Sequence, residues 1–234
     1  MSYKRILLKL SGEALAGDKK TGFDEATCMM VAGQVKNLVK EGIQVAVVIG
    51  GGNFWRGRSS ETINRVQADQ IGMLATIMNC IYVSEIFRHI GMGTRVFTPF
   101  EVGTVTDIFT MDAANEALSK GEVIFLAGGT GHPYFSTDTA TALRAIELSC
   151  DIILMARAVD GVYDSDPKKN PAAKKYDKIS FAEILDKKLE ILDTTATVMC
   201  MQNSMPILLF SLNEKDAITK NCTGQTTGTI VYVK

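Results

Sequence analysis

The sequence predicts an α/β protein, a three-layer αβα sandwich whose middle layer is a mostly parallel, twisted sheet. The first observation is that its apolar runs are too short for helices and suit buried strands. The second is that a run such as Val123–Ala127 (VIFLA) is apolar at every position, as in strands covered on both faces. The third is that these runs alternate with segments of helical periodicity. No linker, repeat or low-complexity segment interrupts the chain, so we expect a single domain over residues 1–234.

The composition is that of a globular protein rather than a nucleic-acid-binding one. Of the 234 residues, 46% are hydrophobic and 22% are charged, which is enough to fill a core. The formal net charge is −1 and no basic stripe is present, which argues against a nucleic-acid partner. The five cysteines are odd in number, widely spaced and without a C-x-x-C pair, as expected for reduced thiols. The N-terminal apolar stretch is too short for a secretory signal, and no run has the length of a membrane span. We therefore expect a cytoplasmic protein with no membrane partner.

The first half of the chain begins with a strand that contains one lysine and continues with two long helices. Apolar side chains recur at helical spacing in both helices, and Gly42 closes the first of them. The second helix has a wide apolar face, which is usually core and otherwise a subunit interface. The expected elements are the strand Arg5–Leu10, the helix Asp24–Glu41, the strand Gln44–Ile49 and the helix Asn64–His89.

The second half continues the alternation with shorter elements. Ser180 and Glu183 form a capping-box pattern, which predicts that a short helix begins there. The segment 168–178 is polar and is expected to be exposed. The other expected elements are strands at Arg95–Phe97, Val123–Ala127, Asp151–Met155, Ile207–Ser211 and Thr229–Val233, and helices at Met111–Lys120, Ala140–Cys150 and Thr194–Asn203.

The segment Glu122–Cys150 has the pattern of an anion site. Its apolar strand ends in Gly128-Gly129-Thr130-Gly131, where a backbone without Cβ atoms can adopt positive φ and approach a ligand. The small polar residues 136–139 follow, and they are of the types that cap helix N-termini. A strand, a glycine turn and a helix N-terminus together direct free amide groups toward a phosphate or carboxylate.

Lys9 lies at the end of an otherwise apolar strand, directly before Ser11-Gly12. A lysine there is costly unless its charge meets a partner, whereas a lysine at a strand end can also extend to solvent. Residues 12–17 have the glycine spacing of a P-loop, but Asp18 stands where that motif requires lysine, so we reject a Walker A site. Residues 17–22 are expected to form a surface loop.

Three further polar positions have both a functional and a plain interpretation. Arg56 follows the second glycine turn, Gly50-Gly51-Gly52-Asn53, and would either bind phosphate or be an exposed loop charge. Asp69 lies near the start of a helix, where a lone acid is usually solvated. The acidic loop 160–166 lacks the glycine and glutamate of an EF-hand, so calcium is discounted. With Tyr163, this loop either faces a nucleotide or is a polar surface loop.

Four of these polar loops directly follow predicted strands: 9–12, 50–56, 128–138 and 160–166. Ligands of open parallel sheets bind beyond the carboxyl ends of the strands, so the four loops are expected to line one crevice. Two glycine turns with Lys9 and Arg56 suggest two anions held close together. This arrangement suits phosphoryl transfer.

Five segments, in order and spread over essentially the whole chain, resemble the bacterial uridylate (UMP) kinases, a branch of the amino acid kinase family. The segments are KLSGEAL (9–15), VIGGGNFWRG (48–57), DQIGMLATIMN (69–79), GGTGHPYFSTDTA (128–140) and VDGVYDSDP (159–167). The resemblance implies transfer of the γ-phosphoryl group of ATP to UMP, giving UDP and ADP, in pyrimidine nucleotide biosynthesis. It also implies that the N-terminal part binds UMP and the C-terminal part binds ATP, and that Mg²⁺ accompanies ATP.

The resemblance also implies roles for individual residues. Lys9, Arg56 and Asp138 would be catalytic, with Asp138 holding Lys9 rather than abstracting a proton. ATP would be bound by Lys9, Leu10, Ser11, Gly12, Gly52, Arg56, Tyr163 and Asp166. UMP would be bound by Gly51, Asp69, Thr130, Gly131, His132, Pro133, Tyr134, Phe135, Ser136 and Thr137. No residue is assigned as a metal ligand, and Arg157 is not carried over because some relatives have a small polar residue there.

Relatives of this kind are hexamers and are activated by GTP and inhibited by UTP, so the resemblance implies a homo-oligomer and such allosteric effectors. Two alternatives stay open. Another kinase of the same family, acting on carbamate or an acyl carboxylate, would share Lys9 and the glycine turns. The fold also resembles a molybdenum storage protein, which binds ATP without turning over as a kinase.

Overall fold

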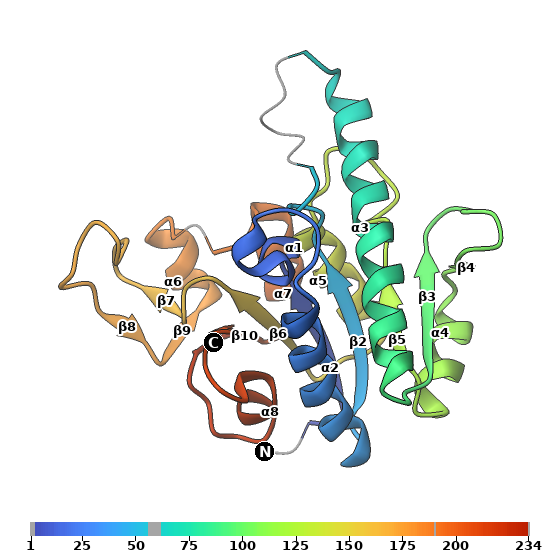
Figure 1. Ribbon diagram of the computed structural model, residues 1–234. Helices are drawn as coiled ribbons and strands as arrows, with labels where there is room; N and C mark the ends of the chain where they lie inside the picture. Colours follow the sequence, from blue (N-terminus) through green and yellow to red (C-terminus); the bar gives the residue numbers. More distant parts are fainter. Residues whose placement is uncertain (1–2, 56–61, 190, 234) are drawn as a thin grey trace.

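The computed structural model describes residues 3–55, 62–189 and 191–233, and in these residues nine strands form one sheet (Figure 1). Their order is β4-β3-β5-β2-β1-β6-β10-β11-β9, and every neighbouring pair is parallel except β10 and β11. The strands are β1 (Arg5–Leu10), β2 (Gln44–Ile49), β3 (Thr94–Thr98), β4 (Asp107–Ile108), β5 (Val123–Leu126), β6 (Ile152–Arg157), β9 (Lys178–Ser180), β10 (Ile207–Ser211) and β11 (Thr229–Tyr232). The short strands β7 (Val162–Tyr163) and β8 (Lys175–Tyr176) pair separately as an antiparallel hairpin.

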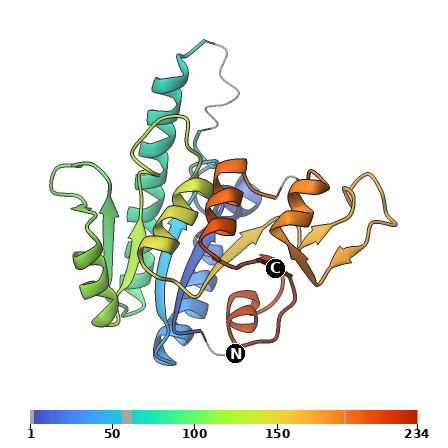
Figure 2. The ribbon, with the colours of Figure 1, turned by 180° about the vertical axis from the view of Figure 1, so that it is seen from behind.

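Helices cover both faces of this sheet. On one face lie α2 (Glu25–Lys40), α3 (Arg65–His89) and α8 (Ala217–Cys222), beside the short α1 (Gly12–Ala16) and the 3₁₀ turn Gly17–Lys19. On the other face lie α4 (Met111–Ser119), α5 (Thr137–Glu147), α6 (Phe181–Asp186) and α7 (Thr194–Gln202). The view from behind shows α5 and α7 side by side on this second face (Figure 2). The predicted mostly parallel three-layer αβα fold is therefore confirmed.

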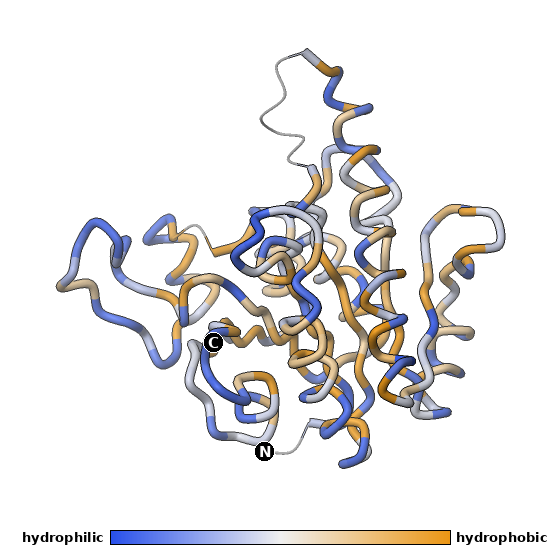
Figure 3. Tube along the Cα trace, in the orientation of Figure 1, coloured by the Kyte–Doolittle hydropathy of each residue, from blue (hydrophilic) through white to orange (hydrophobic). Residues whose placement is uncertain are grey.

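Side chains of β1 alternate between the two hydrophobic cores because successive residues of a strand point to opposite faces. Ile6, Leu8 and Leu10 pack in the core beneath α2 and α3, whereas Leu7 packs in the core beneath α5. Lys9 therefore points to the α5 face. The central strands are apolar, while the excursion between β7 and β8 is mostly hydrophilic (Figure 3).

The structure corrects some element boundaries. α5 begins at Thr137, not at Ala140, because Ser136 takes the cap position and accepts hydrogen bonds from the amides of Asp138 and Thr139. Asp138 is therefore a first-turn residue and not the cap. The helix α8 and the short strands β4 and β7–β9 were not predicted, since each is too short to show a period in the sequence.

The long helix α3 alters one expectation about membranes. Among the described residues, this 25-residue helix passes the length and composition test for a membrane span, because its most apolar 18-residue window has a mean hydropathy of 1.3, contrary to the expectation that no run reaches this length. Half of its most apolar stretch is buried inside the protein, and core helices of soluble proteins pass the same test. The outer face carries Ile71, Leu74 and Met78, which are exposed.

Candidate active site

A cluster of three charged side chains, of which Lys9 and Asp138 are largely buried and Arg157 is 33% exposed, occupies the carboxyl-terminal edge of the sheet. The Nζ atom of Lys9, at the end of β1, lies 2.8 Å from Oδ1 of Asp138 in the first turn of α5. The Nη2 atom of Arg157, the last residue of β6, lies 2.8 Å from Oδ2 of the same carboxylate. The Lys9 and Asp138 side chains are only 7% and 15% exposed. We call these three residues the ion triad.

Adjacent strands bring the triad together. β1 pairs with β6, and Lys9 stands opposite Met155, so Arg157 ends its strand just beyond Lys9. Arg157 is held further by hydrogen bonds from Nη2 to the carbonyl oxygen of Ile191, at 2.7 Å, and to Sδ of Met155. Its Nε atom is buried and lacks a hydrogen-bond partner among the described residues. An unpaired buried donor costs free energy, so this part of the guanidinium is held at a cost to stability.

The triad keeps Asp138 ionised. Burial alone would raise the pKa of its carboxyl, but the charges of Lys9 and Arg157, and the hydrogen bonds they donate, hold the pKa below its ordinary value. With both oxygens occupied by cations, the carboxylate is a weak base at neutral pH. Asp138 is thus suited to hold cations in place rather than to accept a proton.

The two glycine turns need glycine for different reasons. In the turn after β5, Gly128, Gly129 and Gly131 have φ of 77°, 63° and 81°, which confirms the predicted left-handed backbone. In the turn after β2 the need is space instead. A Cβ on Gly51 would lie 2.9 Å from Cβ of Ala75 and 3.0 Å from the carbonyl oxygen of Gly72.

The turn after β2 also lies directly against the turn after β1. A Cβ added to Gly12 would lie 2.4 Å from the carbonyl oxygen of Gly50, and the amide of Gly50 donates to the carbonyl of Leu10 at 3.0 Å. Ser11 caps α1 by accepting from the amide of Ala14. The loops that follow β1 and β2 are therefore in contact, as the sheet rule predicts.

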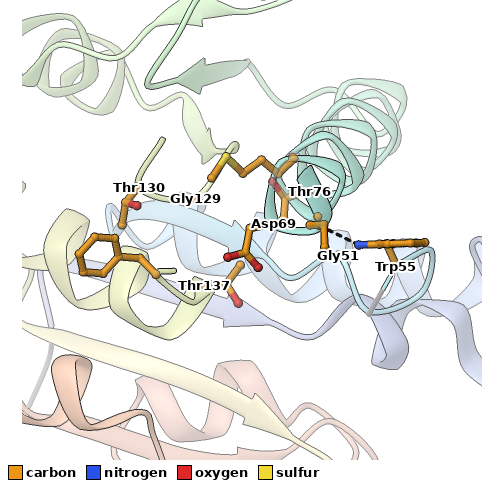
Figure 4. A pocket seen from close by; sticks show the side chains of 11 residues that line it. Gly51, Trp55, Asp69, Thr76, Gly129, Thr130 and Thr137 are labelled. Carbon is orange, nitrogen blue, oxygen red and sulfur yellow. Dashed lines mark hydrogen bonds between the residues drawn. The ribbon is translucent and has the colours of Figure 1, made fainter. Parts of the chain in front are cut away.

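A small pocket opens between α3 and the two glycine turns (Figure 4). It holds about 130 Å³, and its polar lining comes from Asp69 and Thr76 on α3 and from Thr130 and Thr137. Its other lining residues are Gly51, Trp55, Ala68, Gly72, Met73, Gly129 and Phe135. We call it the acceptor pocket.

Asp69 is not the solvated first-turn charge that a lone acid would usually be. Its side chain is only 15% exposed, and its Oδ2 accepts from Nε of Arg65 at 2.8 Å and from the amide of Tyr134 at 2.7 Å. Tyr134 has φ of 72°, which is strained for a residue with a side chain, and Arg65 lies over its ring. Asp69 thus fastens the segment 130–137 to α3.

A larger cavity of about 540 Å³ lies on the other side of the triad and is lined by Arg157 itself. Its apolar lining includes Val162, Leu189 and Leu209, and its polar lining includes Tyr163 and Asp166. The hydroxyl of Tyr163 donates to Asp160 at 2.7 Å, and this bond is the main cause of the raised pKa of the tyrosine. We call this the donor cavity.

The donor cavity adjoins a second hollow of about 560 Å³. Arg157 and Ala158 line both, and Ser11 and Glu13 line only the second hollow. The predicted ATP-binding residues therefore fall into two groups, with Tyr163 and Asp166 in the cavity and Ser11 at the adjoining hollow.

Some predicted site residues lie elsewhere. The Leu10 side chain is fully buried in the core, so only its backbone could face a ligand. Gly131, His132, Pro133, Tyr134 and Ser136 do not line the acceptor pocket, although Gly51, Asp69, Thr130, Phe135 and Thr137 do. Arg56 lies outside the described residues.

The structure also adds residues that sequence reasoning missed. Arg157 belongs to the triad, and only the pairing of β6 with β1 in the structure reveals it. Asp193 caps α7 and accepts from the hydroxyls of Ser136 and Thr139, so it joins α7 to the start of α5. Thr76 accepts from the amide of Gly128 at 2.8 Å and so ties α3 to the glycine turn.

Comparisons with known proteins agree with this arrangement. A profile of the amino acid kinase family matches residues 4–211. The structure of UMP kinase from Bacillus anthracis is 34% identical, with 99% of this chain and 97% of that chain covered and a TM-score of 0.95. The structure of UMP kinase from Ureaplasma parvum is also 34% identical, with 99% and 100% covered and a TM-score of 0.94. With a match over most of its length and the fold of these kinases, the chain belongs to the amino acid kinase family.

Proposed function

We propose that this chain is a UMP kinase, which transfers the γ-phosphoryl group of ATP to UMP and produces UDP and ADP. The observation that carries the proposal is the ion triad, with Lys9 and Arg157 held by one carboxylate beside both the donor cavity and the turns of the acceptor pocket. The likeness to two UMP kinases over nearly the full chain supports uridylate as the acceptor. The same likeness supports one kinase domain over residues 1–234, with UMP bound by its N-terminal part and ATP by its C-terminal part.

The reaction needs no general base. A phosphate oxygen of UMP is already ionised near neutral pH and attacks the γ-phosphorus, while the bond to the β–γ bridging oxygen breaks and ADP leaves with the electron pair. Catalysis then consists of positioning and charge stabilisation. Lys9 and Arg157 balance the charge on the transferring group, and Asp138 keeps both cations in place. Arg56, by family likeness, adds a third cation.

Mg²⁺ would enter with the nucleotide. Within residues 3–55, 62–189 and 191–233, no three His, Cys, Asp or Glu side chains are grouped so that they could hold a metal ion. An ion bound there would take most of its ligands from phosphates and water, which is common for Mg²⁺. Bound in this way, it would neutralise phosphate charge, and Lys9, Arg157 and Arg56 would supply the remaining positive charge.

The acceptor pocket and the donor cavity would bind their substrates through different interactions. Asp69 accepts hydrogen bonds from UMP in the acceptor pocket, and the apolar wall of the donor cavity at Val162, Leu189 and Leu209 contacts the base of ATP. Tyr163 and Asp166 border that wall. Ser11, Gly12 and Gly52 present backbone groups to the donor phosphates. By family likeness the enzyme is a cytoplasmic homohexamer of pyrimidine biosynthesis, activated by GTP and inhibited by UTP.

A substrate panel tests the proposal. ATP and Mg²⁺ are supplied with UMP, CMP, carbamate or an acyl carboxylate, and ADP and the phosphorylated product are quantified by chromatography. UMP is expected to give equal amounts of ADP and UDP, with slower turnover of CMP and none of the carboxylates. Turnover of a carboxylate but not UMP would assign another reaction of the family. Tight ATP binding without turnover of any acceptor would favour a storage role.

A further inference from the structure

Two asparagines form a fully buried amide pair beneath the glycine turns. Asn53, the last residue of the turn after β2, is 3% exposed, and Asn79 on α3 is 0% exposed. The Nδ2 atom of Asn53 donates to Oδ1 of Asn79 at 3.0 Å, and the Nδ2 atom of Asn79 donates to Oδ1 of Asn53 at 2.8 Å. Neither side chain lines the acceptor pocket or the donor cavity.

The remaining N–H groups of the pair join two further backbone segments. Asn53 donates to the carbonyl of Gly22 at 2.9 Å, and Asn79 donates to the carbonyl of Gly50 at 2.7 Å. Each amide nitrogen has two N–H groups, so all four donors of the pair are used. The pair therefore binds together α3, the turn after β2 and the exposed loop that leads into α2.

The turn after β1 rests against the same pair. A Cβ on Gly12 would lie 2.3 Å from Oδ1 of Asn53, so the Ser11-Gly12 backbone is in direct contact with this side chain. One helical turn before Asn79, Thr76 accepts the amide hydrogen of Gly128. One face of α3 thus holds three of the loops that surround the ion triad.

We propose that Asn53 and Asn79 are positioning residues for phosphoryl transfer, which set the spacing between the turns that hold donor and acceptor phosphates. The inference rests on the proposed function, since it assigns the pair to that reaction. Misplacing reacting groups by about 1 Å can cost on the order of 10²-fold in rate, whereas binding of each substrate depends on its own pocket. Losing the pair should therefore lower kcat more than it raises either KM.

Asn221 offers a matched control, because it is an equally buried asparagine in another part of the protein. It is 1% exposed on α8, donates to Ala217 and Thr227 and accepts from the amide of Thr227. In Figure 1, α8 lies at the end of the sheet away from α1. Truncating Asn221 removes a similar number of buried hydrogen bonds without touching the glycine turns.

The experiment compares Asn53→Ala, Asn79→Ala, the double variant and Asn221→Ala. Unfolding in urea ranks their stabilities, and steady-state kinetics below each melting transition gives kcat and both KM values. We expect Asn79→Ala to lower kcat by about 10-fold with KM changes under about threefold, and Asn221→Ala to keep the parent kcat. The double variant should lose no more than the worse single variant, since the two residues act as a unit.

Amide hydrogen exchange adds a measurement that requires neither a known acceptor substrate nor saturating substrate concentrations. The amides of Phe54 and Trp55, which both bond to the carbonyl of Gly51, should exchange about 10-fold faster in either pair variant and unchanged in Asn221→Ala. Parent-like kcat and exchange in both pair variants would overturn the inference, as would an equal kcat loss in Asn221→Ala. If one pair variant fails to fold, the other decides. Absence of UMP turnover in the parent would instead refute the proposed function, and exchange would still test the positioning.

Discussion

Lys9 and Asp138 face each other across two layers of the protein, with Nζ and Oδ1 separated by 2.8 Å. Asp138 is thereby a structural centre as well as a candidate catalytic residue, because its second oxygen holds Arg157 at the same distance. One carboxylate sets the position of two cations that come from different strands. The roles of the three side chains can be separated by substitution.

Replacing Lys9 with alanine should lower kcat by at least ~10²-fold, because a preorganised charge that acts on the transferring group is lost. The measurement is UMP-dependent ADP formation at saturating substrates. Lys120→Ala, which removes an exposed lysine paired with Glu116, serves as control and should keep parent activity. Near-normal kcat for Lys9→Ala would leave Lys9 a structural role only.

Replacing Asp138 with asparagine should lower both kcat and stability. As a mere helix cap, the position would tolerate asparagine with no change in Tm, but the structure gives the cap to Ser136. Without the carboxylate, Lys9 becomes a buried cation without a counter-charge, which costs about 3 kcal/mol, and the partly exposed Arg157 loses an ion pair. We expect a lower Tm together with a kcat loss of ~10²-fold. A stable Asp138→Asn variant with full activity would contradict the catalytic and structural role assigned to the ion triad.

Two substitutions of Arg157 can distinguish the effect of its charge on kcat from the effect of its geometry. Arg157→Lys keeps a positive charge but not the rigid guanidinium whose Nη2 atom contacts Asp138 and the Ile191 carbonyl together, so kcat should fall by about 10-fold. Arg157→Met removes the charge and should cost ~10²-fold. The matched control is Arg95→Met, which breaks a surface pair with Asp107. Equal activity of the Lys and Met variants would show that charge at this position does not contribute.

Asp69→Asn should raise KM for UMP by about 10-fold or more and leave KM for ATP nearly unchanged, because a hydrogen bond to a charged group is lost in the acceptor pocket only. Asparagine retains an oxygen for Arg65 and the Tyr134 amide, so the segment should stay in place. Arg65→Met tests separately whether the contact between Arg65 and Asp69 is needed to hold the segment 130–137 in place. A parallel rise in both KM values would indicate a general loss of structure.

Acidification should weaken the folded state through Asp138. Its pKa is lower in the folded protein than the ordinary 3.8, so the stabilisation that it provides is fully present above that value. The contribution is lost as the pH falls toward the folded-state pKa. Urea unfolding measured stepwise from neutral to strongly acidic pH should show a shallower decline in Asp138→Asn than in the parent. Identical profiles would remove Asp138 as a cause of acid sensitivity.

The sheet could be predicted from sequence because its central strands are buried on both faces. A run such as Val45–Ile49 has no competing interpretation once a glycine turn follows it. The helix α8 could not be predicted, since six residues, Ala217–Cys222, are too few to display a helical period. The start of α5 was wrong because residues 136–139 are all plausible caps, and only the contacts of Ser136 decide among them.

Site residues could be predicted where neighbouring residues in the sequence form a recognisable motif. They could not be predicted where their role depends on contacts between segments that are distant in the sequence. Lys9 and the glycine turns carry local signals, and the Lys9–Asp138 contact was anticipated from family likeness. Arg157 carries no such signal, because its significance depends on β6 lying next to β1. The amide pair of Asn53 and Asn79 likewise could not be predicted from the sequence, because it forms only where α3 packs on the turn after β2.

The place of β1 between β2 and β6 has a consequence for how this protein is made. Lys9 leaves the ribosome long before Arg157, and the two meet only when β6 inserts beside a strand made near the beginning of synthesis. Pairing between strands so distant in sequence forms slowly, since a long loop must close first. Asp138, which precedes β6 in the chain, can meet Lys9 earlier, but its second oxygen gains Arg157 only when β6 takes its place, so the ion triad is completed by a late pairing of strands.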